Sequence, residues 1–133
     1  MSQLPTEIVV LGLSVILLFG QLFLQGVLST LQRGVAHNAG PRDEAIPLRG
    51  KYAGRADRAF RNLLETYPVF VALALALTVT GRTGGWGAIG AEVWIVARVV
   101  FVAIYLSGVP MIRSLVWLAS VFGLFAMLVR LFQ

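Results

Sequence analysis

The sequence predicts an all-α integral membrane protein, a bundle of four transmembrane helices in up-down order. Two compositional observations lead there: 58% of the 133 residues are hydrophobic and only 13% are charged, against about 25% charged in soluble domains. The mean hydropathy is +0.83. A chain this short and this apolar cannot bury its hydrophobic surface in one globular core, so lipid must cover much of it. Four apolar stretches are each long enough to cross a bilayer.

The first predicted span covers residues 8–31. Its few polar residues, Gln21, Gln25 and Ser29, recur every four positions, which places them on one face of a helix. We interpret this face as turned toward other helices instead of lipid, and as a surface that a single subunit need not bury. No basic residue precedes the span, which argues against a cleaved signal peptide.

Residues 33–54 form the only long loop, rich in glycine and proline and without an apolar period, which predicts irregular structure. Between residues 33 and 61 there are seven basic residues and three acidic ones. The positive-inside rule therefore places this loop in the cytoplasm and both termini on the opposite side. The loop charges can also simply pair with one another and with lipid headgroups.

The second predicted span, residues 55–80, carries an unusual polar stripe into the membrane. Arg58, Arg61, Asn62 and Glu65 stand at i, i+3, i+4 and i+7, which is one side of a helix. If the helix enters the bilayer near residue 55, the Glu65 carboxylate lies roughly 15 Å deep. A carboxylate at that depth is costly unless a cation meets it.

The third and fourth predicted spans, residues 88–107 and 110–132, follow short glycine- and proline-containing turns, so neighbouring spans are antiparallel. Arg98, near the middle of the third span, is expected at a depth similar to that of Glu65. We therefore predict that Glu65 and Arg98 form a structural ion pair, because each charge alone would be costly in the membrane.

Polar groups from several spans converge at the cytoplasmic mouth, where guanidinium groups outnumber carboxylates. This pattern suits an anionic ligand that carries carboxylates, although the arginines can instead extend to phospholipid phosphates. No cysteine and a single histidine leave no metal site to predict, and topology explains the net charge of +5 without nucleic acid. The converging residues are Arg33, Arg55, Arg58, Arg61, Asn62, Tyr105, Arg113 and Ser114.

The segment from Arg58 to Pro68, Arg-Ala-Phe-Arg-Asn-Leu-Leu-Glu-Thr-Tyr-Pro, resembles the second-helix signature of the MAPEG family, membrane-associated proteins in eicosanoid and glutathione metabolism. The resemblance continues through the segments that contain Arg98, Tyr105 and Arg113, so it covers essentially the whole chain. It implies one domain over residues 1–133. It also implies a homotrimer of four-helix subunits that binds glutathione between adjacent subunits near the cytoplasmic surface.

The resemblance also implies roles for individual residues. In the family's transferases, residues matching Arg61, Asn62, Glu65 and Tyr105 hold glutathione, and the residue matching Arg113 activates its thiol. Ser114 matches a serine near that thiol in the prostaglandin E synthase branch. Phe101 stands where that branch has a histidine, and Thr66 stands where the leukotriene C synthase branch has a tyrosine. These departures disfavour an eicosanoid substrate and favour a bacterial-type member in the inner membrane.

The predicted function is that of a glutathione-dependent membrane transferase or peroxidase. Glutathione is the co-substrate, and its thiolate would attack a lipophilic electrophile or lipid hydroperoxide that arrives from the bilayer. The alternative is a membrane scaffold or lipid-binding protein that keeps the fold without catalysis. A four-span transporter fits less well, because the charges cluster at one mouth and the first span has no central acid.

Overall fold

The computed structural model describes residues 3–48 and 50–133 and is entirely helical in its regular elements. Four of the helices are long and apolar enough to cross a membrane, as the sequence predicted, so the chain is a multi-pass integral membrane protein. A fifth, short helix lies in the loop after the first span. The helices are α1 (Thr6–Arg33), α2 (Val35–Ala39), α3 (Lys51–Val79), α4 (Trp86–Ser107) and α5 (Pro110–Phe132).

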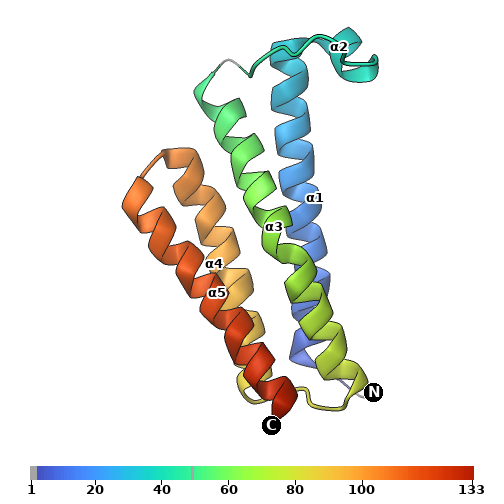
Figure 1. Cartoon of the computed structure of the whole chain (residues 1–133), viewed down its shortest axis with the longest axis vertical. Coiled ribbons are helices and arrows are strands. Elements are labelled where there is room, and N and C mark those ends of the chain that lie inside the picture. Colours follow the sequence, from blue (N-terminus) through green and yellow to red (C-terminus); the bar gives the residue numbers. More distant parts are fainter. Residues whose placement is uncertain (1–2, 49) are drawn as a thin grey trace.

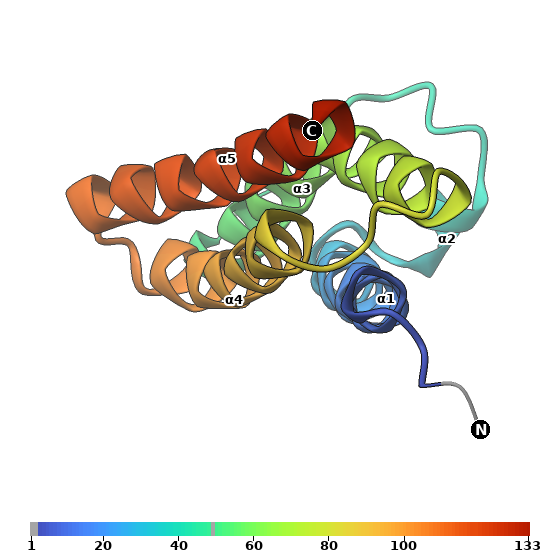
Figure 2. The ribbon, with the colours of Figure 1, turned by 90° about the horizontal axis from the view of Figure 1, so that it is seen from below.

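The four long helices run alternately up and down, which confirms the predicted up-down order (Figure 1). Both termini and the α3–α4 turn lie at one end of the bundle, and α2 and the α4–α5 turn lie at the other. The helices associate as two pairs, α1 with α3 and α4 with α5, and the end view shows the two pairs beside each other (Figure 2). We call the end that carries α2 the loop end.

The loop that the sequence predicted to be irregular contains the single turn of α2, and α3 begins at Lys51, four residues before the predicted start of the second span. Gly34 lets the chain turn after α1 because its φ of 90° is readily adopted only by glycine. The Asn38 Nδ2 then donates a hydrogen bond to Thr30 Oγ1 (2.8 Å), which ties α2 back onto α1. One helical turn is too short to produce a detectable apolar period.

The core centres on an aromatic contact between α3 and α4. The rings of Phe70 and Trp94 stack with centroids 3.9 Å apart and planes 1° apart. Nearby, the hydroxyl groups of Ser14 and Tyr67 share a hydrogen bond of 3.0 Å, which satisfies two polar groups inside the apolar bundle. These contacts fix α3 against both α1 and α4, and therefore fix the position of the side chains that α3 presents at the loop end.

The close packing of α4 against α5 depends on two glycines that face each other, Gly90 and Gly123. A Cβ atom on either glycine would collide with the backbone carbonyl of the other. Small residues at a helix crossing allow backbones to approach closely, which is the usual source of helix association in lipid. The α4–α5 pair is the most extensive helix contact in the chain.

The polar face predicted on the first span packs mostly inside the single chain. Gln21 is 5% exposed and Ser29 is 7% exposed, whereas Gln25 is half-buried. The prediction that this face turns toward other helices is confirmed. The further interpretation, that a single subunit need not bury the face, is wrong for Gln21 and Ser29, because both are buried in the single chain and Asn38 of α2 contacts Ser29. These two residues therefore give no argument for a subunit partner.

At the opposite end, the buried carboxylate of Glu7 holds the α3–α4 turn. Its Oε1 accepts a hydrogen bond of 2.7 Å from the backbone N–H of Gly84. Gly87 lies so close that a Cβ there would approach Glu7 Oε1 to 2.8 Å. The start of α1 is thereby fixed to the turn between α3 and α4, which completes the bundle at the end away from the predicted site.

Candidate functional site

The loop end carries two polar pockets, which contact different sides of α3. The α3–α5 pocket has a volume of about 260 Å³ and is lined by Asn62, Phe101, Tyr105, Arg113, Ser114 and Trp117. The α1–α3 pocket has a volume of about 620 Å³, and its polar lining is Gln25, Ser29, Thr30, Arg33, Asn38, Arg42, Asp57 and Arg61. Arg61 and Asn62 are consecutive, so their side chains point about 100° apart around the helix.

Arg113 supplies the positive charge of the α3–α5 pocket. Pro110 begins α5, where the missing N–H of proline costs no hydrogen bond, and Arg113 follows three residues later. Its guanidinium carbon lies 4.8 Å from the centroid of the Tyr105 ring, a cation–π contact that fixes the side chain beside α4. Within the described residues no carboxylate lies within 4.0 Å of Arg113. The guanidinium is therefore free to meet an anion.

Tyr105 packs against Phe101, which in turn packs against the buried guanidinium of Arg98. Arg98 is only 1% exposed, and its guanidinium carbon lies 4.7 Å from the Phe101 ring centroid. The Phe101 ring in turn packs at 5.4 Å against the Tyr105 ring, with planes tilted by 53°. Arg98 Nη1 also donates a hydrogen bond of 2.9 Å to Asn62 Oδ1. Arg98 thus positions both Asn62 and the aromatic wall of the pocket.

The predicted ion pair between Glu65 and Arg98 does not form in the single chain. Among residues 3–48 and 50–133, the Arg61–Asp57 pair is the one ion pair within 4.0 Å. Arg98 instead bonds to Asn62, which lies one helical turn closer to the loop end on a neighbouring part of the α3 surface. Estimating depth from residue number is accurate only to about one turn, so it could not distinguish these two partners.

Glu65 lies at the midpoint of α3 and is exposed on the single chain. An exposed carboxylate in the middle of a membrane-spanning helix is costly when it faces lipid. Arg58, two turns nearer the loop end on the same side of α3, is also exposed. This side of α3 separates the two pockets, and neither residue lines either pocket. The exposed charges indicate a surface that something other than lipid covers.

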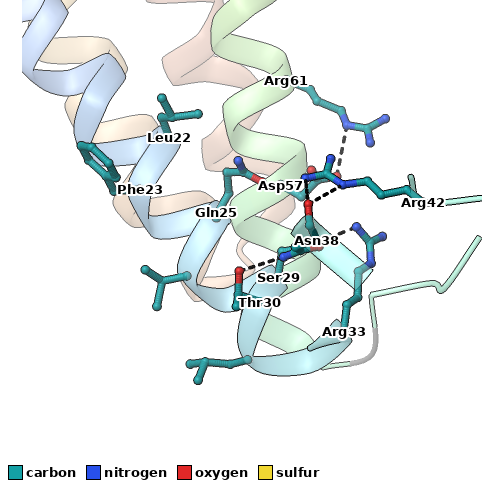
Figure 3. Close-up of a pocket in the computed structure, with 13 residues that line it drawn as sticks. Leu22, Phe23, Gln25, Ser29, Thr30, Arg33, Asn38, Arg42, Asp57 and Arg61 are labelled. Atoms are coloured by element: carbon teal, nitrogen blue, oxygen red, sulfur yellow. Dashed lines mark hydrogen bonds and ion pairs between the residues drawn. The ribbon is translucent and has the colours of Figure 1, made fainter. Parts of the chain in front are cut away.

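The α1–α3 pocket contains three guanidinium groups and one carboxylate (Figure 3). Arg61 Nε lies 3.1 Å from Asp57 Oδ2, one turn earlier on α3. Arg33 Nε donates to the Ile46 carbonyl at 2.7 Å and Nη1 donates to Ser29 Oγ at 3.4 Å. Arg42 donates to the Asn38 carbonyl. The pocket is therefore strongly basic, and α2 forms part of its wall.

The structure divides the predicted mouth cluster into parts. Asn62, Tyr105, Arg113 and Ser114 lie together, as predicted, in the α3–α5 pocket. Arg33 and Arg61 lie in the α1–α3 pocket, and Arg58 and Glu65 lie on the exposed side of α3 between the two. A single subunit therefore does not bring all of the predicted residues around one ligand.

Several residues that line the pockets escaped the sequence analysis, among them Trp117, Asn38 and Arg42. Trp117, one turn after Arg113, lines the α3–α5 pocket and also an apolar groove of about 350 Å³ between α3 and α5. Trp117 lies four residues after Arg113, a spacing that places both on one face of a helix and could have indicated it. Asn38 and Arg42 carried no such signal, because their loop has no periodic pattern. The other residues that line the groove are Thr66, Val69, Leu73, Val121, Leu124, Phe125 and Leu128.

Fold and site together define a class of protein: a membrane protein with four spanning helices, whose polar α3–α5 pocket meets an apolar groove. Residues 8–133 match the MAPEG family, and the chain belongs to that family. Comparisons with curated proteins and with solved structures each found no match. Among residues 3–48 and 50–133, no group of three histidine, cysteine or acidic side chains is placed to hold a metal ion.

Proposed function

We propose that the protein is a glutathione-dependent membrane transferase or peroxidase, in which Arg113 stabilises the glutathione thiolate for attack on a lipophilic electrophile or lipid hydroperoxide. The family includes enzymes of both kinds. One observation carries the proposal: the Arg113 guanidinium, without a carboxylate partner among the described residues, lies where a polar pocket meets an apolar groove at Trp117. A water-soluble thiol and a lipid-soluble substrate can meet there.

The chemistry requires a cation and no base. A free thiol has a pKa of about 8.5, and the thiolate is the nucleophile. Arginine keeps its proton at physiological pH, so it lowers the pKa of a bound thiol by electrostatic attraction. A depression of two units corresponds to about 2.7 kcal/mol. The displaced proton would leave to water through the open side of the pocket. Ser114 Oγ, which donates a hydrogen bond of 3.4 Å to the Pro110 carbonyl, would orient the sulfur beside Arg113.

The groove between α3 and α5 suits the second substrate. Its lining is almost entirely apolar, and Val69 and Phe125 in it are exposed on the single chain, so a molecule dissolved in lipid could reach it. Two polar atoms in it, Thr66 Oγ1 and Trp117 Nε1, are buried without a hydrogen-bond partner among the described residues. A lipophilic molecule that carries one polar group near its reactive atom would satisfy them.

We further propose that the complete site forms between adjacent subunits of a homotrimer. The α3–α5 pocket of one subunit would hold the thiol, and the α1–α3 pocket of its neighbour would bring a basic surface that includes Arg33 and Arg61 to the anionic ends of glutathione. This arrangement would cover the exposed side of α3, so that Arg58 and Glu65 contact glutathione or the neighbouring subunit instead of lipid. The loop end would lie in the cytoplasm of a bacterial inner membrane.

Glutathione is expected to bind the detergent-solubilised protein saturably in a calorimetric titration. At a pH below the thiol pKa of free glutathione, the bound ligand should still show the ultraviolet absorption of a thiolate. S-methylglutathione is the matched control, because it keeps both carboxylates and cannot ionise at sulfur. Absence of binding by both ligands would contradict the enzyme proposal and favour a non-catalytic membrane scaffold.

Mixed trimers test whether the site crosses the interface. A subunit carrying Arg113→Ala and a subunit carrying both Arg33→Ala and Arg61→Ala should each be inactive as homotrimers. Co-expressed, they should recover part of the activity, because one type of interface then joins an intact Arg113 to intact Arg33 and Arg61. If native mass spectrometry shows mixed trimers that remain inactive, all of these residues act within one subunit.

A further inference from the structure

Arg42 has a backbone conformation that arginine seldom adopts. Its φ of 59° is in the left-handed region, and it is the one non-glycine residue with positive φ among the described residues. Such a conformation costs of order 1 kcal/mol and persists only where the surroundings impose it. Here two hydrogen bonds do so: Nε and Nη2 of Arg42 donate to the Asn38 carbonyl at 3.1 and 2.8 Å.

Asn38 connects Arg42 to the first span. Its side-chain Nδ2 donates to Thr30 Oγ1 at 2.8 Å, so the same residue binds α1 through its amide and Arg42 through its carbonyl (Figure 3). The short helix α2 therefore connects Arg42 to α1 and holds the arginine at the pocket. The Nη1 group of Arg42 makes no hydrogen bond among the described residues and is free to donate to a ligand.

The three guanidinium groups of the α1–α3 pocket differ in what already neutralises them. Arg61 pairs with Asp57 at 3.1 Å. Arg33 and Arg42 donate only to neutral oxygens, namely Ser29 Oγ and the carbonyls of Ile46 and Asn38. The pocket thus offers a site with both charges at Arg61 and Asp57, and purely positive sites at Arg33 and Arg42.

This pattern matches the two ends of glutathione, whose γ-glutamyl end carries an ammonium and a carboxylate and whose glycine end carries a carboxylate alone. We propose that Arg42 binds the glycine carboxylate and is a specificity-determining residue for glutathione, an inference that rests on the proposed function. The γ-glutamyl end then lies at the Arg61–Asp57 pair, where an ammonium can meet Asp57 and a carboxylate can meet Arg61. The fork of donors on Arg42, preorganised by Asn38, suits a planar carboxylate.

Affinity measurements on two ligands test this assignment. In calorimetric titrations, Arg42→Ala should raise the Kd of glutathione about tenfold, as expected for one lost charge-assisted hydrogen bond. Glutathione ethyl ester, in which the glycine carboxylate is blocked, should bind the unaltered protein about tenfold more weakly than glutathione. The ester should show no further loss with Arg42→Ala, because the ligand group that Arg42 binds is already missing.

Two further variants separate recognition from folding and from general charge. Arg42→Gly removes the guanidinium while relieving the left-handed backbone, so it should lose as much glutathione affinity as Arg42→Ala. Lys51→Ala removes an exposed cation from the start of α3, outside both pockets, and should leave the Kd unchanged. If Lys51→Ala weakens binding as much as Arg42→Ala, only the net charge matters and the assignment is wrong.

The remaining outcomes are also decisive. If the unaltered protein binds no glutathione, the proposed function fails and the role of Arg42 fails with it. If glutathione binds and Arg42→Ala changes the Kd of neither glutathione nor its ethyl ester, only the Arg42 assignment is overturned. The same holds if Arg42→Ala raises both Kd values equally. If Arg42→Ala leaves glutathione affinity intact and abolishes thermal stabilisation by phosphatidylglycerol micelles, Arg42 is an anchor for lipid phosphate.

Discussion

Replacing Arg113 with alanine is expected to lower the rate with a lipophilic electrophile about a hundredfold, while the Kd of glutathione changes by no more than about tenfold. In the proposed mechanism the guanidinium acts on the sulfur, and a thiol pKa shift near two units corresponds to that loss of rate. The proposed contacts with the carboxylates of glutathione come from other residues and would remain. The cation–π contact with Tyr105, at 4.8 Å, would be lost without opening the bundle, because α5 is held by its Gly123 contact with α4.

Stopped-flow and steady-state rates with a chromogenic electrophile, together with the thiolate absorption of bound glutathione, measure the effect. The absorption band should disappear in Arg113→Ala. Arg130→Ala is the matched control: it removes the same type of side chain from the other end of α5, where Arg130 Nε bonds to the Arg82 carbonyl at 3.2 Å. If the band and the rate survive the loss of Arg113, that residue contacts only lipid headgroups.

The fold was predictable because each span is an apolar stretch of nearly membrane length, and a bilayer permits little else than helices there. The paired placement of Arg113 and Tyr105 was predictable for a related reason. A short turn joins α4 to α5, so residues near that turn must face each other. Local chain geometry thus determined half of the candidate site.

The division of the predicted residues between two pockets could not be predicted in this way. It depends on which helices pack on each side of α3, and no sequence pattern shows that directly. Arg61 and Asn62 are neighbours in the chain, yet one faces α1 and α2 while the other faces α4 and α5. A polar stripe over seven residues covers enough of a helix circumference to serve two pockets. The position of Arg42 at the pocket was also unpredictable, because a single turn of helix and one backbone carbonyl hold it in place.

The buried guanidinium of Arg98 should make Asn62 unusually important for stability. Arg98 is 1% exposed, and its Nε and Nη2 already lack partners among the described residues. Asn62 Oδ1, 2.9 Å from Nη1, is the side-chain acceptor that remains. Asn62→Leu, which keeps the volume and removes the acceptor, is therefore expected to lower the free energy of unfolding in detergent by about 3 kcal/mol. Thermal unfolding without glutathione measures the loss.

A pair of double-mutant cycles identifies the partner of Arg98. Combining Asn62→Leu with Arg98→Met should cost about 2 kcal/mol less than the sum of the single losses, because the double variant leaves no buried charge unpaired. The cycle of Glu65→Gln with Arg98→Met is the comparison, since Glu65 is exposed and attracts Arg98 electrostatically without an ion pair within 4.0 Å. Its coupling energy should be clearly smaller than that of the Asn62 cycle. A larger coupling to Glu65 than to Asn62 would mean that assembly redirects Arg98 to the carboxylate that its depth along the chain first indicated.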